Sequence, residues 1–188
     1  MKRKQNSREK ICDAALRLFT QKGIKATTTK EIARKAGVAE GTIYIYFKSK
    51  NQLAYEMFTE HMNHFRELLK NSVISVTDPL DLLNKLIRTF YQFAENEPLR
   101  YSYIVIGHHS ELEKMPKPEP KPKDIFVEAI KRGIENGKFR NIDPNLAASY
   151  IIGMITRSIM FYKNGLLKCR YEELIAETEN CSKRILSE

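Results

Sequence analysis

Apolar residues recur every three or four positions through most of the chain, the spacing that places them on one face of an α-helix. The first such stretch predicts a helix that starts at a capping box over residues 6–9 and ends at Gly23. The apolar face of this helix consists of Ile11, Ala14, Ala15, Leu18 and Phe19.

A second, short helix is expected between Thr28 and Gly37. The Thr28 hydroxyl and the Glu31 carboxylate have the spacing of a capping box, in which each side chain satisfies a free amide group at the start of the helix. Gly37 suits the left-handed position that closes a helix.

The segment after Gly37 carries conflicting signals. Residues 42–47 are β-branched or aromatic throughout, which by propensity alone favours a strand. In a helix, however, Ile43 and Phe47 would share one buried face, whereas a strand would need a pairing partner and the chain has no second run of this kind. We therefore expect a helix over residues 40–47, which completes a helix-turn-helix.

Capping signals divide the rest of the chain into further helices. Residues 49–52 resemble a capping box that opens a long helix, and Asp78 and Asp143 each precede a proline at a first helical position. The other expected helices lie near residues 79–95, 98–109, 123–136, 144–164 and 171–186. The pattern predicts an all-α fold.

The excess of positive charge is confined to the first quarter of the chain. The formal net charge is +9, and the first 50 residues hold 13 Lys and Arg against 4 Asp and Glu. The remaining residues hold 19 of each sign. This asymmetry indicates a basic head that binds a polyanion, followed by a body without net charge. A hydrophobic content of 42% is enough for a core.

Composition also bears on location and redox state. No stretch approaches the roughly 18 apolar residues of a membrane helix, so we expect a cytoplasmic protein with no membrane partner. Cys12, Cys169 and Cys181 are odd in number and far apart, which favours reduced thiols. Residues 114–123 alternate proline with mostly basic residues, which indicates either a recognition segment for a partner or a solvated loop.

Residues 8–53 carry a long ordered motif. It comprises an AAL-x-LF run, a doubled threonine before I-A-x-x-A-G-V, and the ending T-I-Y-x-Y-F-x-x-K. This motif resembles the DNA-binding domain of the tetracycline-repressor (TetR) family of bacterial transcriptional regulators. The resemblance implies a three-helix DNA-binding domain over residues 1–48 and a helical effector-binding and dimerisation domain over residues 49–188. The implied protein is a homodimer without a cofactor that binds an inverted repeat in double-stranded DNA and releases it when a small molecule binds.

The resemblance also implies which residues contact DNA. Thr29 and Lys30 would meet phosphates at the start of the second helix, and Glu40 and Gly41 would lie where base edges are read. The other implied contacts, mostly to the phosphate backbone, are Thr42, Tyr44, Ile45, Tyr46 and Lys50. Because Glu40 is an anion, it must accept from a cytosine amino group, cap its helix or point away. Residues 2–4 form either an arm that reaches a groove or a disordered terminus.

Two further sets of residues are expected in the second domain. An apolar or aromatic effector would contact Met62, Phe65, Phe90, Phe93, Tyr101, Tyr103, Ile104, His108, Met154 and Phe161. A dimer interface would use Ala147, Tyr150, Ile151, Met154, Ile155, Ser158, Ile159 and Tyr162, which mix small and large groups on one helix.

Other functions remain open from the sequence alone. A helical adaptor whose basic head binds RNA is the main alternative. His61 and His64 on one helix, with a second cluster formed by His108, His109 and Glu111, make a metal site conceivable, although no metal is expected. No nucleophile and base pair or phosphate-binding glycine loop stands out, so we expect no enzyme.

Overall fold

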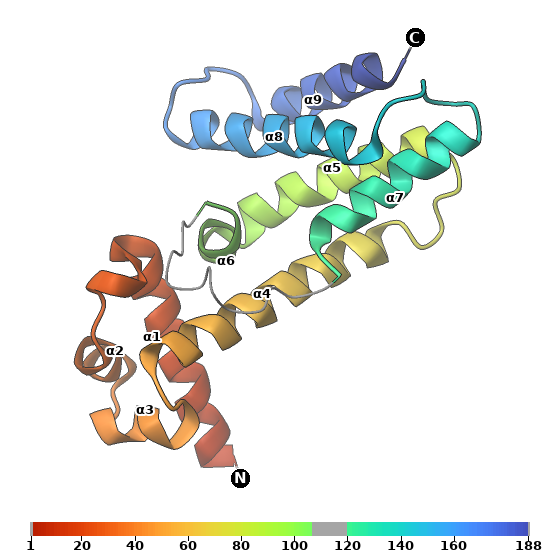
Figure 1. Ribbon diagram of the computed structural model, residues 1–188. Helices are drawn as coiled ribbons and strands as arrows, with labels where there is room; N and C mark the ends of the chain where they lie inside the picture. Colours follow the sequence, from red (N-terminus) through yellow and green to blue (C-terminus); the bar gives the residue numbers. More distant parts are fainter. Residues whose placement is uncertain (1, 107–119, 188) are drawn as a thin grey trace. The chain divides into compact units, whose positions relative to one another are not determined.

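The computed structural model describes residues 2–106 and 120–187, and within these ranges the chain is helical and contains no β-strand (Figure 1). The α-helices are α1 (Lys2–Ala26), α2 (Thr29–Ala36), α3 (Glu40–Tyr46), α4 (Lys50–Ser72), α5 (Pro79–Asn96), α6 (Pro98–Tyr101), α7 (Pro122–Glu135), α8 (Pro144–Lys163) and α9 (Tyr171–Leu186). A π-helical turn, Ser102–Ile106, follows α6. The predicted all-α fold is confirmed.

The predicted caps position the first helices. Gly23 adopts a non-helical conformation with φ 83° and interrupts α1. Thr28 and Glu31 form both bonds of the capping box on α2, and Gly37 closes this helix with φ 67°. The predicted start of the first helix is wrong, because α1 begins at Lys2 and not at the box over residues 6–9. The residues before this box are mostly Lys, Arg and Gln, which are strong helix formers.

The chain divides into two compact units. Unit 1 consists of the described residues of 1–62 and 97–118, and unit 2 of those of 63–96 and 119–188. This division differs from the predicted boundary between residues 48 and 49. The reason is Tyr103, whose ring stacks on Phe19 and whose hydroxyl donates to the carbonyl of Ala54 at 2.8 Å. These contacts bind the segment after α6 to α1 and to the first half of α4.

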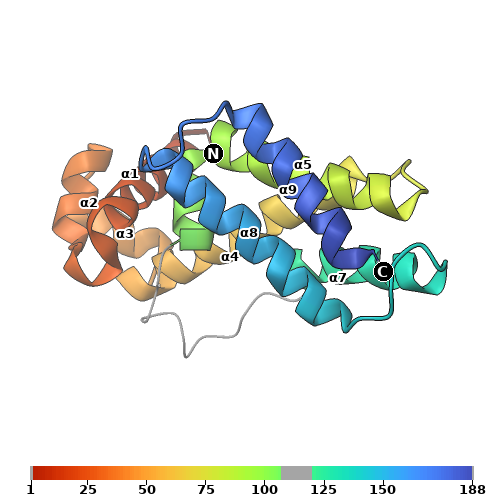
Figure 2. The same cartoon turned by 90° about the horizontal axis from the view of Figure 1, so that it is seen from above.

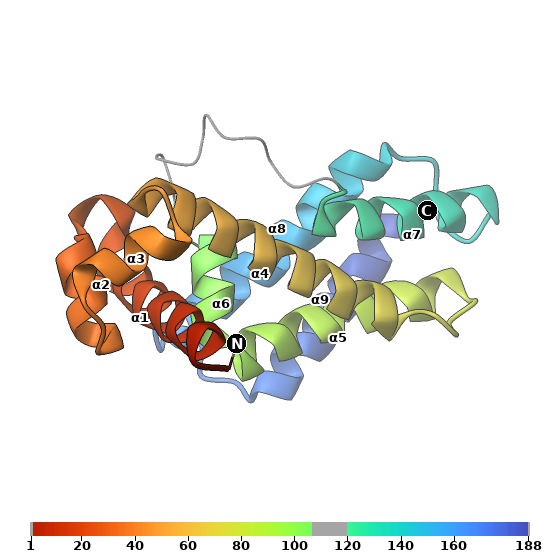
Figure 3. The same ribbon diagram turned by 90° about the horizontal axis from the view of Figure 1, so that it is seen from below.

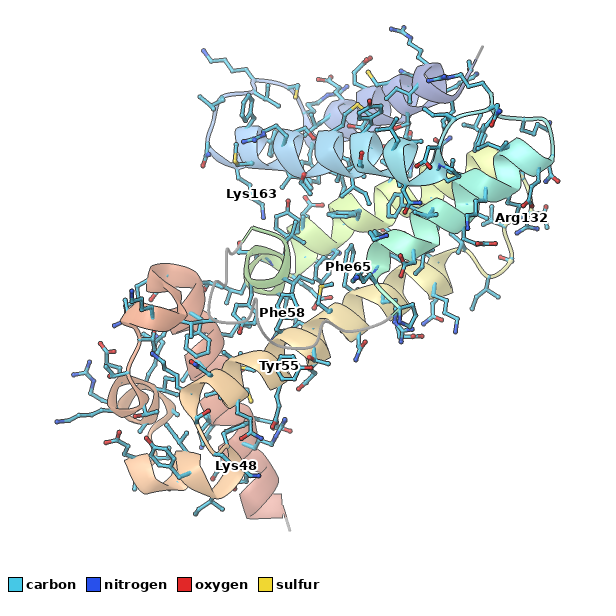
Figure 4. The ribbon with its side chains drawn as sticks, in the orientation of Figure 1. Lys48, Tyr55, Phe58, Phe65, Arg132 and Lys163 are labelled. Atoms are coloured by element: carbon cyan, nitrogen blue, oxygen red, sulfur yellow. The ribbon has the colours of Figure 1, made fainter. Side chains whose placement is uncertain are left out.

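Unit 2 is built around α5, which packs against α7, α8 and α9. Figure 2 shows α8 and α9 side by side, and Figure 3 shows the second half of α4 running between α5 and α7. The core holds an aromatic cluster: Phe65, labelled in Figure 4, stacks on Phe93 at 4.4 Å between ring centroids and meets the edge of Phe90. Phe126 on α7 packs against Phe90, so three helices contribute rings to one apolar layer.

Within the described ranges, no helix combines the length and the apolar character needed to cross a membrane.

Candidate nucleic-acid interface

Helix α3 presents two distinct faces. Ile43 and Phe47 are 0% and 1% exposed, whereas Tyr44 and Ile45 are 54% and 67% exposed. The buried pair packs this short helix onto α1 and α2, so burial overrides the strand propensity of the segment. The opposite face leaves large apolar and aromatic side chains in solvent, which indicates a surface made for contact.

Three side chains connect the starts of α2 and α3. The Thr29 hydroxyl donates to the Glu40 carboxylate at 2.6 Å, and the Tyr44 hydroxyl donates to the Thr29 hydroxyl at 3.4 Å. The Glu40 carboxylate is therefore directed at the start of the neighbouring helix α2, and its contact with a base edge stays a prediction. This arrangement orients the Tyr44 ring and fixes α3 relative to α2.

An ion pair ties α1 to α2 at the same end of unit 1. Lys22 Nζ lies 2.6 Å from Glu31 Oε1. The hydrogen bond from Lys22, together with those from Thr28, lowers the pKa of Glu31 to about 2. Glu31 is therefore ionised at any ordinary pH and caps α2 as an anion, which also suits the helix dipole.

Lys50 makes contacts that the sequence did not reveal. Its ammonium group donates to the carbonyl oxygens of Thr27 at 2.6 Å, Ile24 at 2.7 Å and Lys25 at 3.3 Å. Because an ammonium group has three donors, the end of α1 and the turn before α2 occupy them all. The phosphate contact predicted for Lys50 is untested, but it would have to displace these bonds, and in this structure the side chain fastens the turn.

The remaining predicted DNA contacts differ in exposure. Lys30 and Gly41 are exposed, and Thr42 and Tyr46 are half-buried. A Cβ atom added at Gly41 would meet nothing within 4 Å, so the glycine leaves open space at the start of α3. With Thr29, Glu40 and the exposed face of α3, these residues form one surface on α2 and α3, named here the reading surface.

The residues predicted to line an effector cavity fall in both units. Those in unit 1 are Met62, Tyr101, Tyr103 and Ile104, and those in unit 2 are Phe65, Phe90, Phe93, Met154 and Phe161. Most are core residues: Tyr101 and Tyr103 are 0% exposed. Phe161, at 38% exposed, instead lies on the surface. His108 lies outside the described residues, as do residues 114–119 of the proline-rich segment.

Unit 2 contains an open groove of about 460 Å³ that the sequence did not reveal. Residues from the second half of α4, the start of α5 and α7 line it, among them Arg66, Leu82, Ile125 and Arg132. The signal that could have located it lies in the helix predicted near residues 123–136, where one stripe mixes apolar and charged residues at helical spacing.

The predicted dimer residues separate by face. Ala147, Ile151, Ile155 and Ile159 recur every four positions and are all 0% exposed within a single chain. They form the inner face of α8, and their burial leaves no surface for a partner.

Other residues of α8 form its outer, exposed face. Tyr150 is 49% exposed, and it is joined there by Leu146 and Phe161, which are 44% and 38% exposed. Met154 and Tyr162 are half-buried. Ser158 is bonded within unit 2, where its hydroxyl lies 2.6 Å from that of Tyr91.

The described residues contain no group of three or more His, Cys, Asp or Glu that could hold a metal ion. The His61 ring packs edge-on against Tyr103, and the His64 ring lies beside Phe93, so both contribute to packing. His109 and Glu111 lie outside the described residues.

Comparison with known proteins agrees with this geometry. A family model described as bacterial regulatory proteins, tetR family, matches residues 11–57. The chain is 27% identical to the HTH-type transcriptional repressor KstR2 of Mycolicibacterium smegmatis, over 84% of this chain and 80% of that protein. It is 29% identical to the fatty acid metabolism regulator protein of Bacillus subtilis, over 85% and 84%.

Among solved structures, AibR in complex with isovaleryl coenzyme A and operator DNA shares the fold. The TM-score is 0.74 at 20% identity, and the alignment covers 93% of this chain and 97% of that one. The matched residues contain both helices of the reading surface and the caps that orient them. The chain belongs to the TetR family of bacterial regulatory proteins and is a DNA-binding transcriptional regulator.

Proposed function

We propose that the protein is a cytoplasmic, dimeric repressor that binds an inverted repeat in double-stranded DNA and releases it when an acyl-coenzyme A binds. The observation that carries the proposal is the reading surface, where Tyr44 and Ile45 stand exposed on a short helix that two buried residues hold in place. The concentration of positive charge in the first 50 residues supplies the attraction to a polyanion. The chain acts by binding and not by catalysis.

The reading surface contains both kinds of DNA contact. The hydroxyls of Thr29, Thr42, Tyr44 and Tyr46 and the Lys30 ammonium group are donors suited to phosphate oxygens, and such contacts fix the position of the protein on the duplex. Glu40 is suited to a base edge, because a carboxylate can accept from the amino group of cytosine.

The outer face of α8 supports a dimer. Leu146, Tyr150 and Phe161 follow one another at helical spacing and expose apolar area that a second copy would cover. Two copies related by a two-fold axis read two half-sites, which lie about 34–36 Å apart or a multiple of that distance.

The acyl chemistry of the effector comes from the relatives. One is named a fatty acid metabolism regulator, and a second protein of the same fold was solved with isovaleryl coenzyme A. An acyl chain also agrees with the apolar effector predicted from the sequence.

Selection of bound duplexes from random DNA tests the proposal. We expect the recovered duplexes to contain an inverted repeat. We also expect dodecanoyl-coenzyme A, but not coenzyme A, to release the protein from them. Retention of single-stranded RNA in preference to any duplex would show a different polyanion. Repeats recovered with no response to any acyl-coenzyme A would leave a DNA-binding regulator with another effector.

A further inference from the structure

The two walls of the groove in unit 2 come from α4 and α7. On α4, Arg66, Lys70 and Val73 follow at spacings of four and three, so they form one stripe. On α7, Ile125 and Arg132, seven positions apart, form a second stripe that also includes Ala129. Leu82 at the start of α5 is 6% exposed and belongs to the apolar floor between them.

Positive charge exceeds negative charge around this floor. The lining residues include four bases, Arg66, Lys70, Lys121 and Arg132, and two acids, Asp124 and Glu128. Asp124 is already engaged, since it accepts from the Lys121 backbone N–H at 2.7 Å and lies 3.1 Å from Lys123 Nζ. The charge that remains for a ligand is therefore positive.

Arg66 offers a donor inside the groove wall. Its Nη2 atom pairs with Glu67 at 2.9 Å, whereas its Nε atom is buried and has no hydrogen-bond partner among the described residues. A guanidinium group has five N–H donors, so an anionic ligand in the groove can accept from those that the pair with Glu67 leaves available.

We propose that this groove binds an anionic amphiphile, whose alkyl chain lies on Leu82, Ile125 and Ala129 and whose carboxylate or phosphate is held by Arg66 with Lys70 or Arg132. Its volume of about 460 Å³ lies within the usual range of about 300–1,000 Å³ for small-molecule sites. The assignment rests on the proposed function only for the acyl nature of the ligand. The negative group could be a fatty acid carboxylate or a coenzyme A phosphate.

Titration calorimetry on the full chain tests the site with three probes: dodecanoate, dodecanoyl-coenzyme A and coenzyme A alone. Arg66→Gln removes the anion contact, and Ile125→Trp fills the space over the floor. Lys131→Gln is the matched control, because Lys131 is exposed on α7 and does not line the groove. Thermal unfolding and binding of the selected duplex, both without ligand, show that each variant is folded.

We expect wild type and Lys131→Gln to bind the acyl probes equally, and Arg66→Gln and Ile125→Trp to bind them about tenfold or more weakly. Preference for dodecanoate would identify the carboxylate as the anchor, and preference for dodecanoyl-coenzyme A the phosphates. Equal binding by folded Arg66→Gln and Ile125→Trp would place the acyl site elsewhere and overturn the inference, while the effector class would stand. No binding of any acyl probe by wild type that still retains DNA would overturn the inference and the effector class together.

Discussion

Replacement of Lys50 by methionine separates a structural role from a DNA contact. The ammonium group makes two short hydrogen bonds, at 2.6 and 2.7 Å, and a longer one at 3.3 Å, all to carbonyl oxygens at the end of α1 or in the turn before α2. Carbonyls at a helix end lack intrahelical donors, and a cation there also complements the helix dipole. Methionine keeps an unbranched apolar side chain of similar length and removes only the charge and the donors.

The magnitude follows from the two short bonds. A hydrogen bond to a charged group contributes about 1.5–3 kcal/mol, and water can replace part of this because Lys50 is half-buried. We expect Lys50→Met to lower the free energy of unfolding by about 2–3 kcal/mol, a large part of the 5–15 kcal/mol typical of a folded domain.

Urea unfolding followed by circular dichroism measures this loss. Lys48→Met is the matched control, since Lys48 is exposed two positions away (Figure 4) and its ammonium makes none of these bonds; its stability should change by less than about 0.5 kcal/mol. For Lys50→Met, a plot of the logarithm of DNA affinity against the logarithm of salt concentration should have the same slope as for wild type. If Lys50→Met is as stable as wild type and its slope is smaller by about one unit, Lys50 contacts phosphate and does not fasten the turn.

Three further changes test other parts of the structure. The hydrogen bond from Lys22 holds the pKa of Glu31 at about 2 against an ordinary value of 4.5, so its stabilisation is complete above about pH 4.5 and is lost as the pH falls through 2. The difference in unfolding free energy between wild type and Glu31→Gln should shrink across that window, and a difference independent of pH would contradict this. Glu40→Gln should bind random duplexes more tightly, because an anion leaves the reading surface, and should recover a different base in a selection experiment; an unchanged sequence preference would exclude Glu40 from base contact. Tyr150→Asp should sediment as a monomer at micromolar concentration where wild type is a dimer, whereas a dimer in both would place the interface away from the outer face of α8.

The sequence was most informative where structure is local. The capping box of Thr28 and Glu31 and the N-caps at Asp78 and Asp143 depend on neighbours within three residues, and each forms as predicted. Helix α3 was also predictable, because one buried pair, Ile43 and Phe47, decides its face.

The faces of α8 could not be assigned in the same way. The stripe from Ala147 to Ile159 and the stripe that includes Leu146 and Tyr150 are both largely apolar, so amphipathicity does not say which points inward. The contacts of Lys50 are out of reach for a different reason: they join residues 23 to 26 positions apart, and the charged side chain gives no hint of backbone acceptors.

The contact between Thr29 and Glu40 limits how the reading surface can meet DNA. A threonine hydroxyl has one proton to donate, and here that proton goes to the Glu40 carboxylate. If Thr29 donates to a phosphate instead, the carboxylate loses its donor while a polyanion approaches, which is unfavourable unless a base amino group replaces the hydroxyl. Contact with the backbone by Thr29 is therefore favoured where the base beneath Glu40 can donate, so a residue that contacts phosphate also acquires a part in sequence discrimination.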